Sequence, residues 1–188
     1  MLPRAHERGF TLIELLVALS LFAILLAMAV PTYINFVSNS QVRNGAEAML
    51  NGVLSAQTAA VNANTQVQLI VTPATGWQIQ FVNPDNSIPA QAPVPPAPYL
   101  LSAGAPQATI TTTPGGATEL TFDAFGRIIP NPDTSQSISC INVTNAAFAS
   151  ARALRVVISN STQATGTKLC DPAVAQTEPQ ACPVTVCS

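Results

Sequence analysis

The sequence predicts an α+β protein in which one long N-terminal helix precedes an antiparallel β-sheet head. Residues 10–30 are almost wholly apolar, and apolar residues over 42–61 recur every three or four positions, which is the period of an amphipathic helix. From residue 66 onward, short alternating runs are separated by proline and glycine, as in strands and turns. With 188 residues the chain has room for one compact domain and an additional segment.

The apolar run from Phe10 to Val30 is long enough to cross a membrane once. Its 21 residues span roughly 30 Å at about 1.5 Å per residue, which matches the hydrocarbon thickness of a bilayer. Arg4 and Arg8 precede the run, so the positive-inside rule places the N-terminus in the cytoplasm and the rest of the chain outside it. One carboxylate, Glu14, lies inside the run and needs an explanation, because an unpaired charge in hydrocarbon is costly.

Three fates of this segment are compatible with its composition. It has the basic start of a secretory signal peptide, with "AMA" at 27–29 as a cleavage site, and it also suits a simple membrane anchor. Neither fate explains Glu14. If the chain is instead cut between Gly9 and Phe10, a free amine arises four residues before Glu14, and the carboxylate can pair with the amine of a neighbouring subunit. Glu14 is then an assembly residue.

The stretch "RGFTLIELLVALSLFAILLAMAVPTY" resembles the class III signal of type IV pilins and of the pseudopilins of type II secretion. The resemblance implies a leader, residues 1–9, that a prepilin peptidase removes after Gly9, with N-methylation of Phe10. It implies that residues 10–30 first cross the membrane and then pack in a filament core, where Glu14 partners a neighbour's amine. Pro31 matches the proline that kinks the helix in this family, since proline lacks a backbone N–H donor.

The helix is expected to continue over residues 31–63 as an amphipathic segment. Its apolar face comprises Val42, Ala46, Met49, Val53, Ala56 and Ala60, joined by Leu50, Leu54 and Val61. Arg43 and Glu47 are four residues apart and are expected to pair on the solvated side. The pattern therefore predicts a helix packed on the sheet of its own head.

Residues 64–188 are expected to form the β-rich head. "QVQLIVT" at 66–72 and "GWQIQFV" at 76–82 read as a hairpin, with Trp77 as a core anchor. Proline recurs in the segment 83–107, which predicts an extended surface loop. Further strands are expected in the ranges 108–113, 119–123, 126–130, 137–143, 152–159 and 167–172.

The four cysteines, Cys140, Cys170, Cys182 and Cys187, all lie in the last quarter of the chain. An even number of cysteines outside the cytoplasm favours disulfides over a metal or redox site. Four cysteines allow three pairings. Cys140 with Cys170 and Cys182 with Cys187 is the favoured pairing, because the first two fall in strand-like stretches and the last two would close a small terminal loop.

The head resembles, less closely, the GspH/FimT-like minor pilins and pseudopilins. The matching pieces are "VQLIV", "GWQI", "FDAFGRI" and "RALRVVIS…GTKLCDP". Minor pilins of this class sit at or near the filament tip and help to start assembly, and some relatives bind DNA through a basic glycine-arginine motif near the last strand. The corresponding residues here are Gly166, Thr167 and Lys168, without the arginine. The candidate contacts to DNA or to a surface are Arg152, Arg155 and Lys168.

The sequence does not predict an enzyme. Its only histidine, His6, lies in the leader, so Ser-His and Cys-His mechanisms lack their base. Asp123 and Asp133 are candidate calcium ligands, but two carboxylates fall short of the six to eight oxygens that calcium takes. We expect neither a metal nor a cofactor.

The leading functional hypothesis is a minor type IV pilin that helps to initiate or cap a pilus. The alternatives are a minor pseudopilin of a type II secretion system and a tip-located pilin that binds DNA or a surface. The expected partners are other pilins or pseudopilins through the N-terminal helix, the prepilin peptidase, the inner-membrane assembly platform and, before assembly, membrane lipid. The expected location is the bacterial inner membrane, with a single pass and a periplasmic head, and then the filament or its tip.

Overall fold

The computed structural model describes residues 10–90, 93–148, 150–161, 164–183 and 187. The chain divides into two compact units, Met1–Val37 and Ser38–Ser188, and each is considered by itself. The helix α1 (Leu12–Ala63) begins in the first unit and ends in the second, so it runs through Pro31 without a break. This confirms the expected single long helix.

In the second unit, α1 packs on the head through one face. The six residues expected at the centre of this face, from Val42 to Ala60, are at most 1% exposed. Leu54 and Val61 were expected on the same face, but they are 44% and 50% exposed. Leu54 follows Val53 by one residue, which is about 100° around the helix. The buried stripe is therefore narrower than the sequence pattern suggested.

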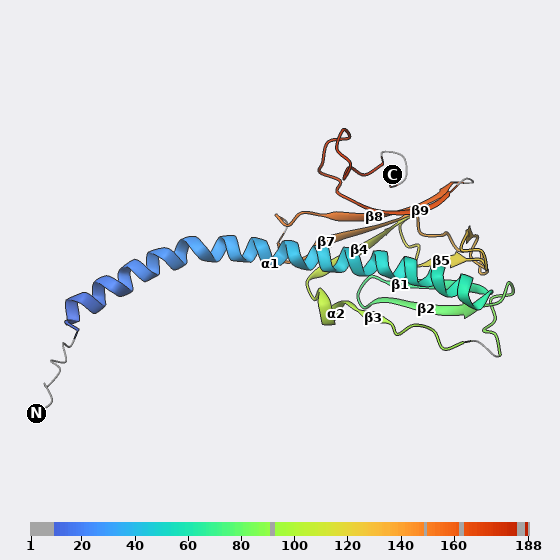
Figure 1. Ribbon diagram of the computed structural model, residues 1–188, viewed down its shortest axis with the longest axis horizontal. Coiled ribbons are helices and arrows are strands. Elements are labelled where there is room, and N and C mark those ends of the chain that lie inside the picture. Colours follow the sequence, from blue (N-terminus) through green and yellow to red (C-terminus); the bar gives the residue numbers. More distant parts are fainter. Residues whose placement is uncertain (1–9, 91–92, 149, 162–163, 184–186, 188) are drawn as a thin grey trace, which may run out of the picture. The chain divides into compact units, whose positions relative to one another are not determined.

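The head contains two antiparallel sheets where the sequence predicted one. The larger sheet has the order β3-β2-β1-β5-β6 and the smaller has the order β4-β7-β8-β9 (Figure 1). Their strands are β1 (Gln66–Thr72), β2 (Gly76–Val82), β3 (Tyr99–Leu100), β4 (Ala108–Thr113), β5 (Glu119–Phe122), β6 (Ile128–Ile129), β7 (Cys140–Asn145), β8 (Leu154–Ser161) and β9 (Ala164–Cys170). The strands separate into two sheets because β4 pairs with β7, whereas β1 pairs with β5.

The segment 83–107 is not entirely the loop that its prolines predicted. β3 pairs with β2, and the short helix α2 (Leu101–Gly104) follows it directly. The N–H of Leu101 donates to the carbonyl of Thr75 at 2.9 Å, and its side chain is buried. Proline is absent from residues 99–105, so this end of the segment retains its backbone donors and can pair.

One hydrophobic core unites the head. It is formed by the buried face of α1 and by residues from both sheets, among them Leu69, Leu120, Ile141 and Val156. A second, smaller cluster lies on the other face of the four-stranded sheet and contains Val157 with the disulfide-bonded cysteines. The C-terminal segment therefore has a packing surface of its own.

Candidate functional site

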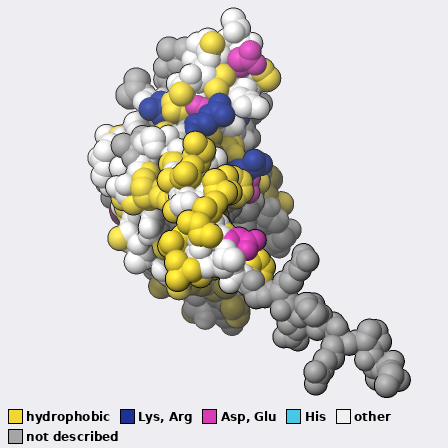
Figure 2. Space-filling model, turned by 90° about the vertical axis from the view of Figure 1, so that its left-hand side faces the viewer, with side chains coloured by type: hydrophobic (Ala, Val, Ile, Leu, Met, Phe, Trp, Pro, Cys, Tyr) yellow, Lys and Arg dark blue, Asp and Glu magenta, His cyan; other side chains and the backbone are white. Residues whose placement is uncertain are grey.

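The first unit presents an apolar helical surface. From Phe10 to Phe36, the large hydrophobic side chains other than half-buried Ile34 are between 46% and 85% exposed, although these residue types are normally buried. Figure 2 shows such side chains gathered on this part of the molecule. The helix α1 is long and apolar enough to cross a membrane, with a mean hydropathy of 2.7 over its most apolar stretch. The described residues of this unit offer nothing that covers this surface.

Glu14 lies in the first turn of α1, where its backbone N–H donates to the side-chain hydroxyl of Thr11 at 3.3 Å. Thr11 immediately precedes the helix, so it serves as the N-cap and Glu14 occupies the third helical position. A carboxylate in this turn also interacts favourably with the helix dipole. Phe10 is exposed one turn away. Gly9, the other half of the expected processing site, lies outside the described residues.

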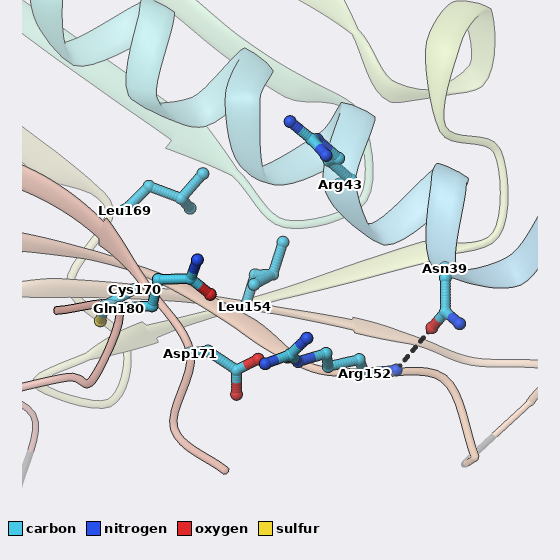
Figure 3. A pocket seen from close by; sticks show the side chains of 8 residues that line it. All are labelled: Asn39, Arg43, Arg152, Leu154, Leu169, Cys170, Asp171 and Gln180. Carbon is cyan, nitrogen blue, oxygen red and sulfur yellow. Dashed lines mark hydrogen bonds and ion pairs between the residues drawn. The ribbon is translucent and has the colours of Figure 1, made fainter. Parts of the chain in front are cut away.

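In the second unit, a cleft of about 450 Å³ separates α1 from β8 and β9 (Figure 3). Leu154 and Leu169 form its apolar floor, and Arg43 and Arg152 stand at its polar edge. Both cations are already paired: Arg43 with Glu47 at 2.7 Å, and Arg152 with the buried carboxylate of Asp171. The cleft therefore has charged side chains at its edge, but each arginine is already neutralised by a carboxylate of the protein.

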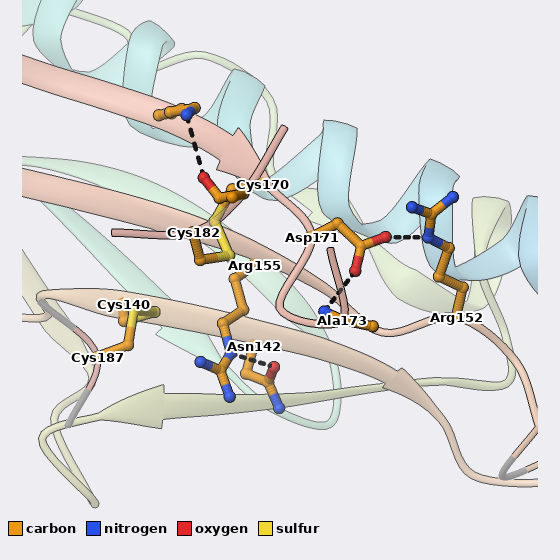
Figure 4. The surroundings of a disulfide bond; sticks show 11 residues. Cys140, Asn142, Arg152, Arg155, Cys170, Asp171, Ala173, Cys182 and Cys187 are labelled. Carbon is orange, nitrogen blue, oxygen red and sulfur yellow. Dashed lines mark hydrogen bonds and ion pairs between the residues drawn. A yellow bond between two sulfur atoms is a disulfide. The ribbon is translucent and has the colours of Figure 1, made fainter. Parts of the chain in front are cut away.

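The expected basic contacts, Arg152, Arg155 and Lys168, lie on or near β8 and β9, and each contacts the protein itself. Arg155 donates from Nε to the side-chain oxygen of Asn142 at 3.2 Å. Lys168 donates from Nζ to the carbonyl of Ala181 at 3.1 Å. Figure 4 shows Arg152 directed toward Asp171 and Arg155 toward Asn142. The carboxylate of Asp171 neutralises Arg152, whereas Arg155 and Lys168 keep their positive charge and only commit one donor each to the protein.

All four cysteines are in disulfides, but the favoured pairing was wrong. The bonds join Cys140 to Cys187 and Cys170 to Cys182 (Figure 4). Cys140 is on β7 and Cys170 on β9, with β8 between them. Two strand spacings amount to roughly 9–10 Å, which exceeds the roughly 7 Å that a disulfide can bridge between Cα atoms. Each strand cysteine instead bonds a cysteine of the C-terminal segment.

The C-terminal segment is consequently fastened to the outer face of the four-stranded sheet. Besides the two disulfides, the N–H of Asp171 donates to the carbonyl of Gln180, and Lys168 contacts Ala181. Asp171 also accepts a bond from the N–H of Ala173 at 2.7 Å, as a turn former does. No local sequence pattern indicates the burial of Asp171 or its pairing with Arg152, since the two lie 19 residues apart.

The carboxylates considered for calcium have other partners. Asp123 accepts from Arg127 at 2.7 Å and from backbone N–H groups of the same turn. Asp133 accepts a hydrogen bond from the N–H of Ser135. The pKa of Glu119 is raised, first by its burial and second by the nearby carboxylate of Asp133. Among the described residues, no group of three or more histidine, cysteine, aspartate or glutamate side chains has the arrangement of a metal site.

Comparisons with known proteins agree with this arrangement. A model of the prokaryotic N-terminal methylation motif matches residues 4–30. The fold is similar to a crystal structure of the type IV minor pilin FimU of Pseudomonas aeruginosa PAO1, with a TM-score of 0.50 and 19% identity, over 79% of this chain and 99% of FimU. A second crystal form of FimU gives a TM-score of 0.47 and 18% identity, over 75% and 99%. No curated protein matches the chain.

The likeness to FimU, at this low identity, establishes the fold alone. The family is established by a separate match: a model of the type II transport protein GspH matches residues 45–162, which is more than half of the chain. This match and the methylation motif also confirm the expected membership of the pilin and pseudopilin superfamily, whose role is structural and not enzymatic. The chain belongs to the GspH family of minor pilins and pseudopilins.

Proposed function

We propose that the chain is a minor type IV pilin that is incorporated into a pilus and helps to initiate or cap its assembly. The observation that carries this proposal is the exposed apolar half of α1, with its single carboxylate, Glu14, in the first turn. Such a surface is unstable in water and requires either lipid or other helices. Lipid covers this surface while the chain is anchored in the membrane, and the helices of other pilins cover it after assembly.

In this proposal the chain has four parts. Residues 1–9 are a leader that the prepilin peptidase removes, residues 10–30 cross the inner membrane, residues 31–63 continue the helix, and residues 64–188 form the periplasmic head. Phe10 becomes the methylated N-terminus. Glu14 then pairs with the amine of a neighbouring subunit, because a carboxylate within a helix bundle is stable only with a partner. Pro31, which lacks an N–H donor, weakens the helix where it would bend.

Two observations bear on the choice between a pilus and a type II secretion system. FimU, whose fold this chain shares, is a type IV minor pilin, and this supports the pilus. The matching family model is described as a type II transport protein, and this supports a minor pseudopilin as the alternative. We favour the pilus because FimU is similar along 79% of the chain and across nearly its own whole length.

Deletion of the gene in its native bacterium, followed by complementation, tests the proposal. We expect fewer pili by electron microscopy, with unchanged secretion of extracellular enzymes. Sheared pili from the complemented strain should contain the chain with a methylated Phe10 as its first residue, detected by mass spectrometry. Normal piliation with impaired secretion would replace the proposal by the pseudopilin alternative. A mature N-terminus at Val30 would overturn both.

A further inference from the structure

A groove runs along one side of α1, away from the cleft at β8 and β9. It consists of two adjoining hollows of about 320 and 400 Å³, and Asn51 lines both. The first hollow also contains Asn44, Trp77 and Tyr99. The second continues along α1 to Asn62, where Pro96 forms part of the opposite wall.

The three asparagines form a straight row along α1. They are spaced by seven and eleven residues, which is close to two and three helical turns of 3.6 residues. Their side-chain amides make no hydrogen bond with any part of the chain that the structure describes. Each free amide offers both donors and an acceptor. The row therefore provides polar contacts for a ligand that extends along the helix.

The stacked rings of Trp77 and Tyr99 line the groove beside Asn44 and Asn51. They are directly opposite each other on β2 and β3, and their ring centroids are 6.4 Å apart with an angle of 18° between the planes. Trp77 is held firmly, because its Nε1 donates to the carbonyl of Ala48 at 2.8 Å and its ring packs on Gly52. The rings are thus oriented before any ligand arrives, which lowers the entropic cost of binding.

We propose that this groove binds a neutral oligosaccharide chain. The face of an aromatic ring is electron-rich and attracts the polarised C–H groups of a sugar ring. The hydroxyl groups of the sugar both donate and accept hydrogen bonds, as side-chain amides do. Among the described residues that line the two hollows, only Glu47 is charged, and it already pairs with Arg43 at 2.7 Å. The described lining therefore offers no cation to an anionic ligand such as DNA. The inference is independent of the choice between pilus and secretion system.

A proline-rich peptide is the competing occupant, and the chain itself contains one. Residues 93–98 include four prolines, and all six are exposed. Aromatic grooves bind such segments, but proline lacks a backbone N–H, so a run of prolines presents mainly acceptors. The oxygens of Asn44, Asn51 and Asn62 would then remain without donors. A sugar hydroxyl satisfies both halves of each amide, so the oligosaccharide fits better.

The test uses the full chain in a detergent without a sugar head group. Trp77 is the only tryptophan, so its fluorescence reports on the groove alone. The probes are cellotetraose, chitotetraose, maltotetraose and mannotetraose, each titrated to millimolar concentration. We expect a saturable change in emission with at least one probe. Tyr99→Ala and Asn51→Ala should each raise the dissociation constant by about tenfold, which is a loss of about 1.4 kcal/mol in binding free energy.

Matched controls separate binding from folding. Phe125→Ala removes an exposed aromatic ring outside the groove, and Gln176→Ala removes an exposed amide there; both should bind as the native chain does. All variants are compared by circular dichroism and thermal unfolding. The proposal is overturned if no tetrasaccharide gives a saturable change, or if both groove variants bind normally. Saturable binding of the hexapeptide PVPPAP, residues 93–98, without binding of any saccharide would overturn it in favour of a peptide groove.

Discussion

At the scale of single residues, Gly52 determines how closely Trp77 approaches α1. A Cβ at this position would lie 2.8–2.9 Å from the indole ring. Gly52→Ala gains about 1 kcal/mol of helix propensity, but overpacking typically costs 1–3 kcal/mol. We expect the variant to unfold at lower temperature by an amount equivalent to about 1 kcal/mol, measured by thermal unfolding. Gly115→Ala is the matched control, since a Cβ there meets nothing within 4 Å. Stabilisation of Gly52→Ala would contradict the observed packing.

Glu119 makes the stability of the head depend on pH. Burial and the nearby carboxylate of Asp133 raise the pKa of Glu119. The folded state therefore holds the proton more tightly than the unfolded state, and stability falls as pH rises through the raised pKa. Glu119→Gln should be more stable than the native chain at pH 7.5 by up to about 1 kcal/mol, the scale of exposed charge pairs.

Urea unfolding at pH 7.5 and at about pH 3 measures this effect, because the carboxyl group is almost fully protonated in both states at the lower pH. The advantage of Glu119→Gln should disappear there. Gln68 donates to Glu119 at 2.7 Å, and the oxygen of the substituted amide can still accept this bond. An equal advantage at both pH values would show that the charge is not the cause.

At the scale of elements, strands could be located from the sequence but their partners could not. The hairpin of β1 and β2 has the predicted bounds, because alternation and a three-residue turn are local signals. The pairing of β4 with β7 joins segments about 30 residues apart, and no local pattern encodes it. The cysteine pairing depends on this strand order. Similarly, the basic residues near β8 were recognisable by type, whereas their partners Asn142 and Asp171 required the fold.

The two disulfides are expected to contribute unequally to stability. Cys140 and Cys187 are separated by 47 positions in the sequence, and Cys170 and Cys182 by 12. A longer loop removes more entropy from the unfolded chain, and the difference between these loops is about 1 kcal/mol. The paired substitution of Cys140 and Cys187 by alanine should therefore destabilise the head more than that of Cys170 and Cys182. Urea unfolding of both variants measures the difference. The reverse order would indicate that local packing around Cys182 matters more than loop length.

At the scale of the whole molecule, the chain combines a well-packed head with an N-terminal half of α1 whose apolar side chains contact little else among the described residues. The first buried residue of α1 is Ser38, whereas the large hydrophobic side chains from Phe10 to Phe36 are exposed, with Ile34 half-buried. The sequence predicted both properties, because an unbroken apolar run and an amphipathic stripe are distinct patterns. It gave no sign of the asparagine groove, since polar residues on the outer face of a helix are ordinary until Trp77 and Tyr99 are seen beside them.

The uncovered helix makes Glu14 the residue on which assembly should depend. Glu14→Ala removes a carboxylate from the apolar run, so insertion into the membrane and cleavage before Phe10 should remain normal. Removing one partner of a buried ion pair costs about 3–5 kcal/mol, so incorporation into filaments should fall more than tenfold. Quantitative mass spectrometry of membrane and sheared-filament fractions measures both quantities. Glu47→Ala is the control, because its exposed pair with Arg43 contributes at most about 1 kcal/mol. If Glu14→Ala entered filaments as readily as this control, the carboxylate would not be paired in the assembly.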